Sequence, residues 1–243
     1  MVERMFSAIA PRYDFLNRLL SAGRDRYWRR EAIRATALPP KGRLLDICTG
    51  TADVALEAAR QFPDARIVGV DFSRPMIALG VSKIERAGLS DRISLQVAPA
   101  EALPFPDHSF DATTVAFGLR NIPDRLRGLR EMYRVLRPGG RTVVLEFTTP
   151  LSPLFRSVYL WYFHRVLPWI GRVVSGHPSA YSYLPASVSD FPSPEGLAGW
   201  MREAGFHQVS YRLLTGGIVG IHVGRKELLA GSGQLAASRF SRR

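Results

Sequence analysis

Residues 43–53 read RLLDICTGTAD, a short apolar run that ends in a loop around Gly50 and continues into helix-favouring sequence. An apolar run of this length predicts a strand that is buried on both faces, as in a parallel sheet. Glycine lets the backbone approach a ligand closely, and the start of the following helix offers free N–H groups. In open α/β sheets, ligands bind beyond the carboxyl ends of the strands. We therefore expect a binding loop here.

The alternation of strand and helix continues along the chain. A second buried strand is predicted at 65–70, and further strands are predicted at 93–97, 110–116 and 141–146. Helices are predicted at 52–61, 75–87, 125–136 and 195–204, of which the third is stopped by a Pro-Gly-Gly turn at 138–140. Residues 206–214 and 218–224 read as an antiparallel strand pair. This order predicts an α/β fold with a doubly wound, mostly parallel seven-stranded sheet and helices on both faces.

Charge gathers at the two ends of the chain. Residues 1–43 carry ten Lys/Arg against four Asp/Glu, and residues 225–243 carry five against one. Such ends suit an anionic membrane surface or nucleic acid. The alternative is a solvated surface of biased composition, because 30 of the 33 basic residues are Arg.

The cysteine content and the hydropathy pattern bear on location. A lone cysteine, Cys48, excludes an internal disulfide and favours a reducing cytoplasm. The chain opens without the apolar segment of a secretory signal, and no window of about 18 apolar residues predicts a spanning helix. The five histidines lack ligand spacing, so no metal is expected. We expect a cytoplasmic protein.

A second motif, VGVD at 68–71, places Asp71 at the end of the next strand. A carboxylate in this position accepts hydrogen bonds from both ribose hydroxyls of a nucleoside bound across the sheet. The alternative is that Asp71 caps the following helix, a role for which Ser73 competes. The loop after the first strand carries neither the dinucleotide fingerprint Gly-x-Gly-x-x-Gly nor a phosphate-binding P-loop.

Taken together, these motifs resemble those of class I S-adenosylmethionine-dependent methyltransferases. The matching elements are Asp46-x-x-x-Gly50-Thr51, Asp71, APAEALPF at 98–105 and LRPGG at 136–140. More selective elements resemble the ubiquinone/menaquinone biosynthesis C-methyltransferase family. They include MFSAIAPRYDFLN at 5–17, FGLRN at 117–121, LEF at 145–147 and AYSYL at 180–184. The resemblance runs from about residue 2 to residue 226.

The resemblance implies that S-adenosylmethionine is the cofactor and that a polyprenylated hydroquinone is methylated on a ring carbon. Conversion of demethylmenaquinol to menaquinol is the favoured reaction, and a ubiquinone precursor (2-polyprenyl-6-methoxy-1,4-benzoquinol) is the alternative substrate. An RNA methyltransferase and a non-catalytic lipid-binding module stay open as other functions. The Asn/Asp-Pro-Pro-Tyr motif of many nucleobase methylases is replaced by FGLRN at 117–121, so no nucleic acid partner is expected.

The resemblance also implies a set of cofactor-binding residues. They are Gly50, Thr51, Asp71, Pro99, Ala100 and, where some members have serine, Ala116. Pro99 stands where Asp or Asn is usual, and it offers neither a side-chain acceptor nor an N–H. The adenine amino group must therefore be recognised by another group, for which a backbone carbonyl is a candidate. Cys48 and Ala52 stand where glycine is usual, and we expect ordinary backbone angles at both.

Methyl transfer to a ring carbon is an in-line displacement that needs alignment and an electron-rich ring. Loss of a phenolic proton activates the ring, so a site for this reaction should favour the phenolate. Arg120 and Asn121 follow the fourth strand at its carboxyl end. We assign Arg120 as the catalytic electrostatic partner and Asn121 as an orienting hydrogen-bond group. The alternative is that both cap the loop before Pro123.

Residues 1–226 are predicted to form one domain: a helical lid (1–40), a cofactor-binding core (41–150) and a helical insertion on the substrate side (151–205). Residues 227–243 are predicted to be a flexible basic tail. Tyr13, Tyr181 and Tyr183 are candidate substrate-binding residues, or they only hold the lid in place. The aromatic stretch 154–174 predicts either an interfacial helix that touches an anionic membrane transiently or a helix that covers the core. The oligomeric state stays open.

Overall fold

The computed structural model describes residues 14, 18, 21–150, 152, 153, 156, 157, 161, 165 and 187–228. In this part of the chain, seven strands form one sheet in the order β3-β2-β1-β4-β5-β7-β6. The first five strands in this order are parallel, and β7 runs antiparallel to both β5 and β6. The predicted fold class is therefore confirmed, including the antiparallel strand pair.

The bounds of the elements follow the predicted ones closely. The strands are β1 (Arg43–Ile47), β2 (Arg66–Asp71), β3 (Ile93–Val97), β4 (Phe110–Ala116), β5 (Leu136–Phe147), β6 (His207–Leu214) and β7 (Val219–Arg225). The helices are α2 (Arg24–Thr36), α3 (Asp53–Gln61), α4 (Arg74–Arg86), α5 (Arg125–Val135) and α9 (Pro194–Glu203). A short 3-10 turn, η1 (Leu119–Asn121), follows β4.

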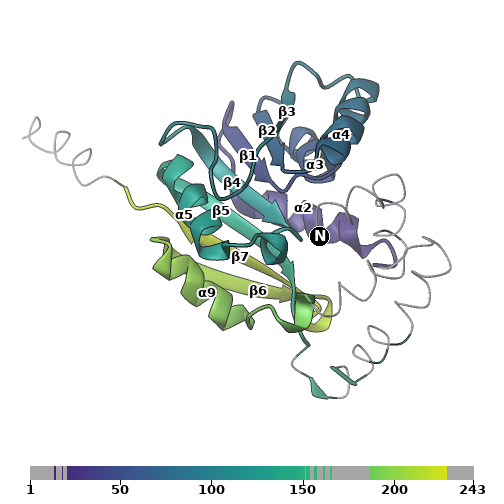
Figure 1. Ribbon diagram of the computed structural model, residues 1–243, viewed down its shortest axis with the longest axis vertical. Coiled ribbons are helices and arrows are strands. Elements are labelled where there is room, and N and C mark those ends of the chain that lie inside the picture. The colour runs from purple at the N-terminus through teal and green to yellow at the C-terminus, as the bar shows by residue number, and fades with distance from the viewer. Residues whose placement is uncertain are drawn as a thin grey trace, which may run out of the picture.

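Helices cover both faces of the sheet (Figure 1). On one face, α5 and α9 bury an apolar core that includes Leu129, Met132 and Met201. On the other face, α2 and α3 pack over the sheet with Ile33 and Ala55. Because both faces are covered, β1 and β2 are largely buried on both sides, as their sequences predict.

The start of β5 differs from the prediction. The sequence predicts a turn at 138–140 and a strand from Arg141, whereas β5 begins at Leu136 and runs through Pro138. The pairing with β4 shifts register at this point. Gly139 adopts φ 80°, and its N–H donates to the Lys226 carbonyl at 3.0 Å. Proline, which lacks an N–H, is tolerated because the ladder is irregular there.

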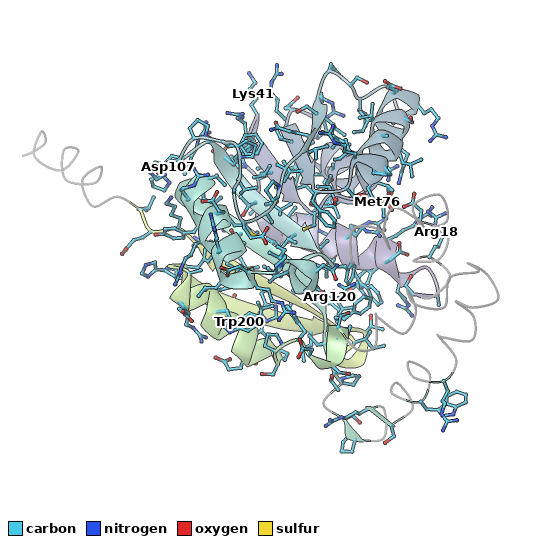
Figure 2. The ribbon with its side chains drawn as sticks, viewed as in Figure 1. Arg18, Lys41, Met76, Asp107, Arg120 and Trp200 are labelled. Carbon is cyan, nitrogen blue, oxygen red and sulfur yellow. The ribbon has the colours of Figure 1, made fainter. Side chains whose placement is uncertain are left out.

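The parallel strands bring their carboxyl ends to one edge of the sheet. Figure 2 shows Lys41 and Asp107, which precede β1 and β4, at one end of the strands, and Arg120, which follows β4, towards the other. Loops that are far apart in the sequence therefore meet beyond β1, β2, β3 and β4. This is the edge at which the sequence predicts a binding site.

Candidate functional site

A cavity of about 420 Å³ opens at this edge, within the usual range for small-molecule sites. It is lined by residues at or just after the ends of four neighbouring strands: Ile47, Cys48, Asp71, Phe72, Ala98, Pro99, Ala100, Glu101, Asn121, Ile122 and Pro123. Most of this wall is apolar. The carboxylate and amide side chains on it are those of Asp71, Glu101 and Asn121. Such a slot suits a flat apolar group held by a few directed hydrogen bonds.

Two backbone N–H groups fix the carboxylate of Asp71. Its Oδ2 accepts a hydrogen bond from the Gly50 N–H at 2.9 Å, and its Oδ1 accepts one from the Ser73 N–H at 2.9 Å. Burial raises the pKa of Asp71, although these two hydrogen bonds act in the opposite direction. Each oxygen retains acceptor capacity for another donor. Ser73, and not Asp71, is the N-cap residue of α4.

The loop between β1 and α3 has an unusual backbone. Cys48, Gly50 and Ala52 adopt φ values of 55°, 56° and 68°. The expectation of ordinary backbone angles at Cys48 and Ala52 is therefore wrong. A non-glycine residue pays about 1–2 kcal/mol for this left-handed conformation. Such residues persist only where the surroundings over-determine the backbone.

Part of this restraint comes from beneath the loop. The Thr49 N–H donates to the Val70 carbonyl at 2.9 Å, and the Thr49 hydroxyl donates to Asp46 Oδ2 at 2.6 Å. The other oxygen of Asp46 is buried with no hydrogen-bond partner. Burial raises the pKa of Asp46 to about 7, because the charged form loses its hydration. Asp46 is thus partly protonated near neutral pH.

Outside the set of residues that line the cavity, the loop contacts a group of polar side chains, here called the loop cluster. Its members come from four segments of the chain: Asp14, Asp25, Arg29, Thr51, Asp53 and Lys83. The Thr51 hydroxyl donates to Asp14 Oδ1 at 2.6 Å, and Lys83 Nζ donates to Asp14 Oδ2 at 2.7 Å and to Thr51 at 3.1 Å. Lys83 also forms an ion pair with Asp53.

Arg29 completes the loop cluster through ion pairs to Asp25 at 2.6 Å and to Asp53 at 3.2 Å. Burial by itself would raise the pKa of Asp53, but the charges of Arg29 and Lys83 outweigh it and hold the pKa below its usual value. Asp53 is therefore ionised at neutral pH. The Thr51 side chain is engaged in this cluster, so any contact from Thr51 to a ligand would come from its backbone.

Arg120 and Asn121 face different surroundings. The Arg120 guanidinium is buried and donates to Glu146 Oε2 at 2.8 Å and to the Phe117 carbonyl at 2.6 Å. It also lies over the Phe147 ring, 5.5 Å from the centroid. Glu146 compensates the charge of Arg120, which is not among the residues that line the cavity. Asn121 does line the cavity.

The structure brings some of the predicted site residues together and not others. Asp71, Pro99, Ala100 and Asn121 share the cavity wall. Gly50 contacts it through Asp71, and Ala116 packs against the apolar cores on the α2 and α3 face. Tyr13, Tyr181 and Tyr183 lie outside the described residues.

Two polar residues were not singled out from the sequence. Glu101 lies close to Pro99 on the cavity wall. It belongs to the motif APAEALPF at 98–105, which the sequence had already indicated as part of the cofactor site. Lys83 gave no local signal, because its partners lie 30 to 69 residues away in the chain. In the described part of the chain, no group of His, Cys, Asp and Glu side chains is arranged to hold a metal ion.

A doubly wound sheet with this strand order, a loop cavity beyond β1 and a fixed acidic residue at the end of β2 are the features of the class I methyltransferase fold. Solved structures share the fold. The [4+2]-cyclase SpnF aligns with a TM-score of 0.69 at 20% identity, covering 93% of this chain and 96% of that one. A SAM-dependent methyltransferase from Aquifex aeolicus aligns with a TM-score of 0.64 at 15% identity, covering 87% and 97%. At these identities the likeness concerns the fold alone.

The chain belongs to the ubiE/COQ5 methyltransferase family, whose model matches residues 1–226. A ubiquinone/menaquinone biosynthesis C-methyltransferase UbiE of Geobacter sulfurreducens is 54% identical over 93% of this chain and 89% of its own length. A demethylmenaquinone methyltransferase of Thermus thermophilus is 53% identical over 90% of this chain and 99% of its own. The protein is therefore a methyltransferase, and S-adenosylmethionine is its cofactor.

Proposed function

We propose that this enzyme methylates a ring carbon of a polyprenylated hydroquinone and converts demethylmenaquinol to menaquinol. The observation that carries the proposal is sequence identity. About half of the aligned residues are identical to those of demethylmenaquinone methyltransferases, over nearly the whole of both chains. The relative from Thermus thermophilus is 53% identical, and that from Deinococcus radiodurans is 51% identical. The methylation of a ubiquinone precursor is the second candidate, because the Geobacter relative is named for both quinones.

The residues of the cavity fit S-adenosylmethionine. Asp71 has acceptor capacity for the ribose hydroxyls, and its position is fixed from both sides. The apolar wall suits the adenine ring. The Pro99 side chain cannot accept a hydrogen bond from the adenine amino group, so we propose that the neighbouring Glu101 carboxylate does. When bound, the cofactor supplies an electrophilic methyl group on a sulfonium.

The protein must then orient the acceptor ring. We propose that Asn121, on the cavity wall, gives an orienting hydrogen bond to the substrate. Arg120 was assigned as the electrostatic partner of a phenolate. Because Glu146 compensates its charge, we propose that Arg120 acts mainly by holding the turn that presents Asn121. Tyr13, Tyr181 and Tyr183 remain proposed contacts to the substrate.

The substrate is tested by incubating the enzyme with methyl-labelled S-adenosylmethionine and one of three acceptors: reduced demethylmenaquinone, the reduced ubiquinone precursor or bulk RNA. We expect label in the naphthoquinol. Label only in the benzoquinol would show that the substrate is the ubiquinone precursor. Label in RNA would contradict the proposal. Cofactor binding without transfer to any acceptor would favour a non-catalytic binding module.

We further propose that the enzyme acts at the inner face of the cytoplasmic membrane, where a polyprenyl chain resides. None of the described helices is long and apolar enough to span a bilayer. The described residues between 152 and 165 are all exposed, among them Trp161 at 63% and the cations Arg156 and Arg165. Tryptophan and arginine favour the interface of an anionic membrane.

Vesicle flotation tests this membrane contact. We expect binding to vesicles that contain anionic lipid, weakened by salt and by Trp161→Ala, and little binding to neutral phosphatidylcholine vesicles. Equal binding to both vesicle types, or none to either, would contradict it.

A further inference from the structure

We propose that Lys83 is a positioning residue for the cofactor, which holds the left-handed loop of residues 48–52 in the conformation that forms the cavity. Binding of S-adenosylmethionine can be measured without any methyl acceptor. The role of Lys83 is therefore tested separately from the identity of the quinone.

The loop needs such restraint because of its sequence. Ala52 is fully buried at φ 68°, and Cys48, at φ 55°, lines the cavity. Both residues carry a Cβ atom, so this conformation has a steric cost for them that it does not have for glycine. On the cavity side, the described hydrogen bond to the loop is the one from the Gly50 N–H to Asp71. Thr49 is held from beneath by Val70 and Asp46, and the loop cluster supplies further restraint.

Lys83 contacts the residues on both sides of Ala52 in the sequence. Its ammonium group donates to the Thr51 hydroxyl at 3.1 Å and pairs with the Asp53 carboxylate. Thr51 is tied again to Lys83 through Asp14, which accepts from both side chains. The two neighbours of the strained residue are thus anchored to one cation.

Helix α4 is packed closely enough to carry this restraint. A Cβ atom on Gly80 would lie 3.3 Å from the Ala52 Cβ and 3.3 Å from the Thr51 carbonyl carbon. Gly80 and Lys83 are three residues apart and so share one face of the helix. The helix therefore lies directly against the loop, and the Lys83 side chain, only 20% exposed, projects from the same face.

Without Lys83, the carboxylates of Asp14 and Asp53 would lose their shared cation. Arg29 would still hold Asp53 at 3.2 Å, but in the described structure the direct partners of Asp14 are Thr51 and Lys83. Like charges would then repel across the loop. Ala52 would be free to relax to ordinary angles, and the Gly50 N–H would leave Asp71.

The test is calorimetric titration of the full-length enzyme with S-adenosylmethionine. We expect Lys83→Met to raise the Kd about tenfold, because a loop held against its backbone preference is released. Arg86→Met is the matched control: it removes the same charge from the same helix, and its described side-chain bond is to the Ser82 carbonyl. The Kd of that variant should stay within about twofold of the parent.

A second substitution separates loop positioning from general stability. Adding Ala52→Gly to Lys83→Met should restore most of the affinity, since glycine takes φ 68° without steric cost. Ala37→Gly is the matched control, because Ala37 is also left-handed, at φ 44°, but lies at the end of α2. Relief of strain there should not restore binding.

Thr51→Val keeps the experiment decisive if Lys83→Met does not fold, because it preserves side-chain shape and removes only the hydroxyl. We expect a Kd raised about threefold, reversed by Ala52→Gly. Wild-type affinity in Lys83→Met or Thr51→Val would overturn the proposal. Equal rescue by Ala37→Gly, or no rescue by Ala52→Gly, would also overturn it.

Discussion

The loop of residues 48–52 has polar groups on two sides, and these groups have different tasks. On the cavity side, Asp71, Glu101 and Asn121 stand in a mostly apolar wall. On the other side, the charged members of the loop cluster are paired with one another. The contrast separates groups that bind a ligand from groups that hold the backbone in place. Residue type alone does not reveal which of the two a carboxylate serves.

The same contrast separates Arg120 from its neighbour Asn121, and Arg120→Met gives the largest expected effect. The substitution leaves Glu146 buried, with 1% of its side chain exposed, and without its cation. We expect a loss of about 3–5 kcal/mol in the free energy of unfolding, measured with urea. Adding Glu146→Gln should recover much of it.

Arg202→Met is the control for this prediction. Its pair with Glu195 is exposed on both sides, so the change in stability should stay within about 1 kcal/mol. If Arg120→Met leaves stability intact and abolishes only turnover, then Arg120 acts on the substrate and the contrast with Asn121 is wrong.

Asp46 tests the buried side of the loop through pH. Its pKa is raised from 3.8 to about 7 in the folded protein, so folding takes up a proton between these values. The associated stability is present below about pH 4 and is lost as pH rises through 7. Asp46→Asn cannot titrate. Relative to the parent, it should gain roughly 2–4 kcal/mol in unfolding free energy between pH 4 and pH 8.

The measurement for Asp46 is urea unfolding of both proteins across this pH range. The difference between the two proteins matters, because other groups titrate equally in both. Parallel stability curves would show that Asp46 is not a proton-binding group of the loop.

Asp71→Asn tests the cavity side. The amide retains one acceptor oxygen, so Gly50, Ser73 and the ribose hydroxyls compete for it. We expect affinity for S-adenosylmethionine to fall about 30-fold, the cost of roughly 2 kcal/mol for lost charge-assisted hydrogen bonds. Titration calorimetry measures it, with the exposed Asp64→Asn as control. Unchanged affinity would remove Asp71 from the ribose site.

Glu101→Gln gives the smallest expected effect and the most specific one. Affinity for S-adenosylhomocysteine should fall about threefold, because a charged acceptor becomes neutral. Discrimination against S-inosylhomocysteine should narrow, since the glutamine amide can turn and donate to the 6-oxo group. The exposed Glu85→Gln should leave both affinities unchanged. Unaltered discrimination in Glu101→Gln would exclude Glu101 from adenine recognition.

The fold was predictable because its signals are local. β3 and β4 have the predicted bounds, since clear turns flank each of them. Asp71 was predictable for a related reason, because the parallel topology places the end of its strand at the ligand-binding edge of the sheet, whereas Pro99 and Ala100 were predicted from the family resemblance. The predicted beginning of β5, Arg141, lies five residues after the observed one, Leu136. Pro138 indicates a turn locally, and the strand tolerates it only because the pairing with β4 is irregular there.

What the sequence could not predict depends on partners that are distant in the chain. Arg120 meets Glu146 26 residues away, and Lys83 meets Asp14 69 residues away. The backbone of Cys48 and Ala52 departs from local preference for the same reason, because tertiary contacts override it.

The central claim is methyl transfer to a ring carbon. The most direct measurement uses S-adenosylmethionine with a ¹³C-labelled methyl group and reduced demethylmenaquinone, followed by carbon NMR of the extracted product. We predict a single labelled methyl group bonded to a ring carbon of the naphthoquinol. Label on a quinol oxygen, or no transfer by enzyme that binds the cofactor normally, would contradict the claim.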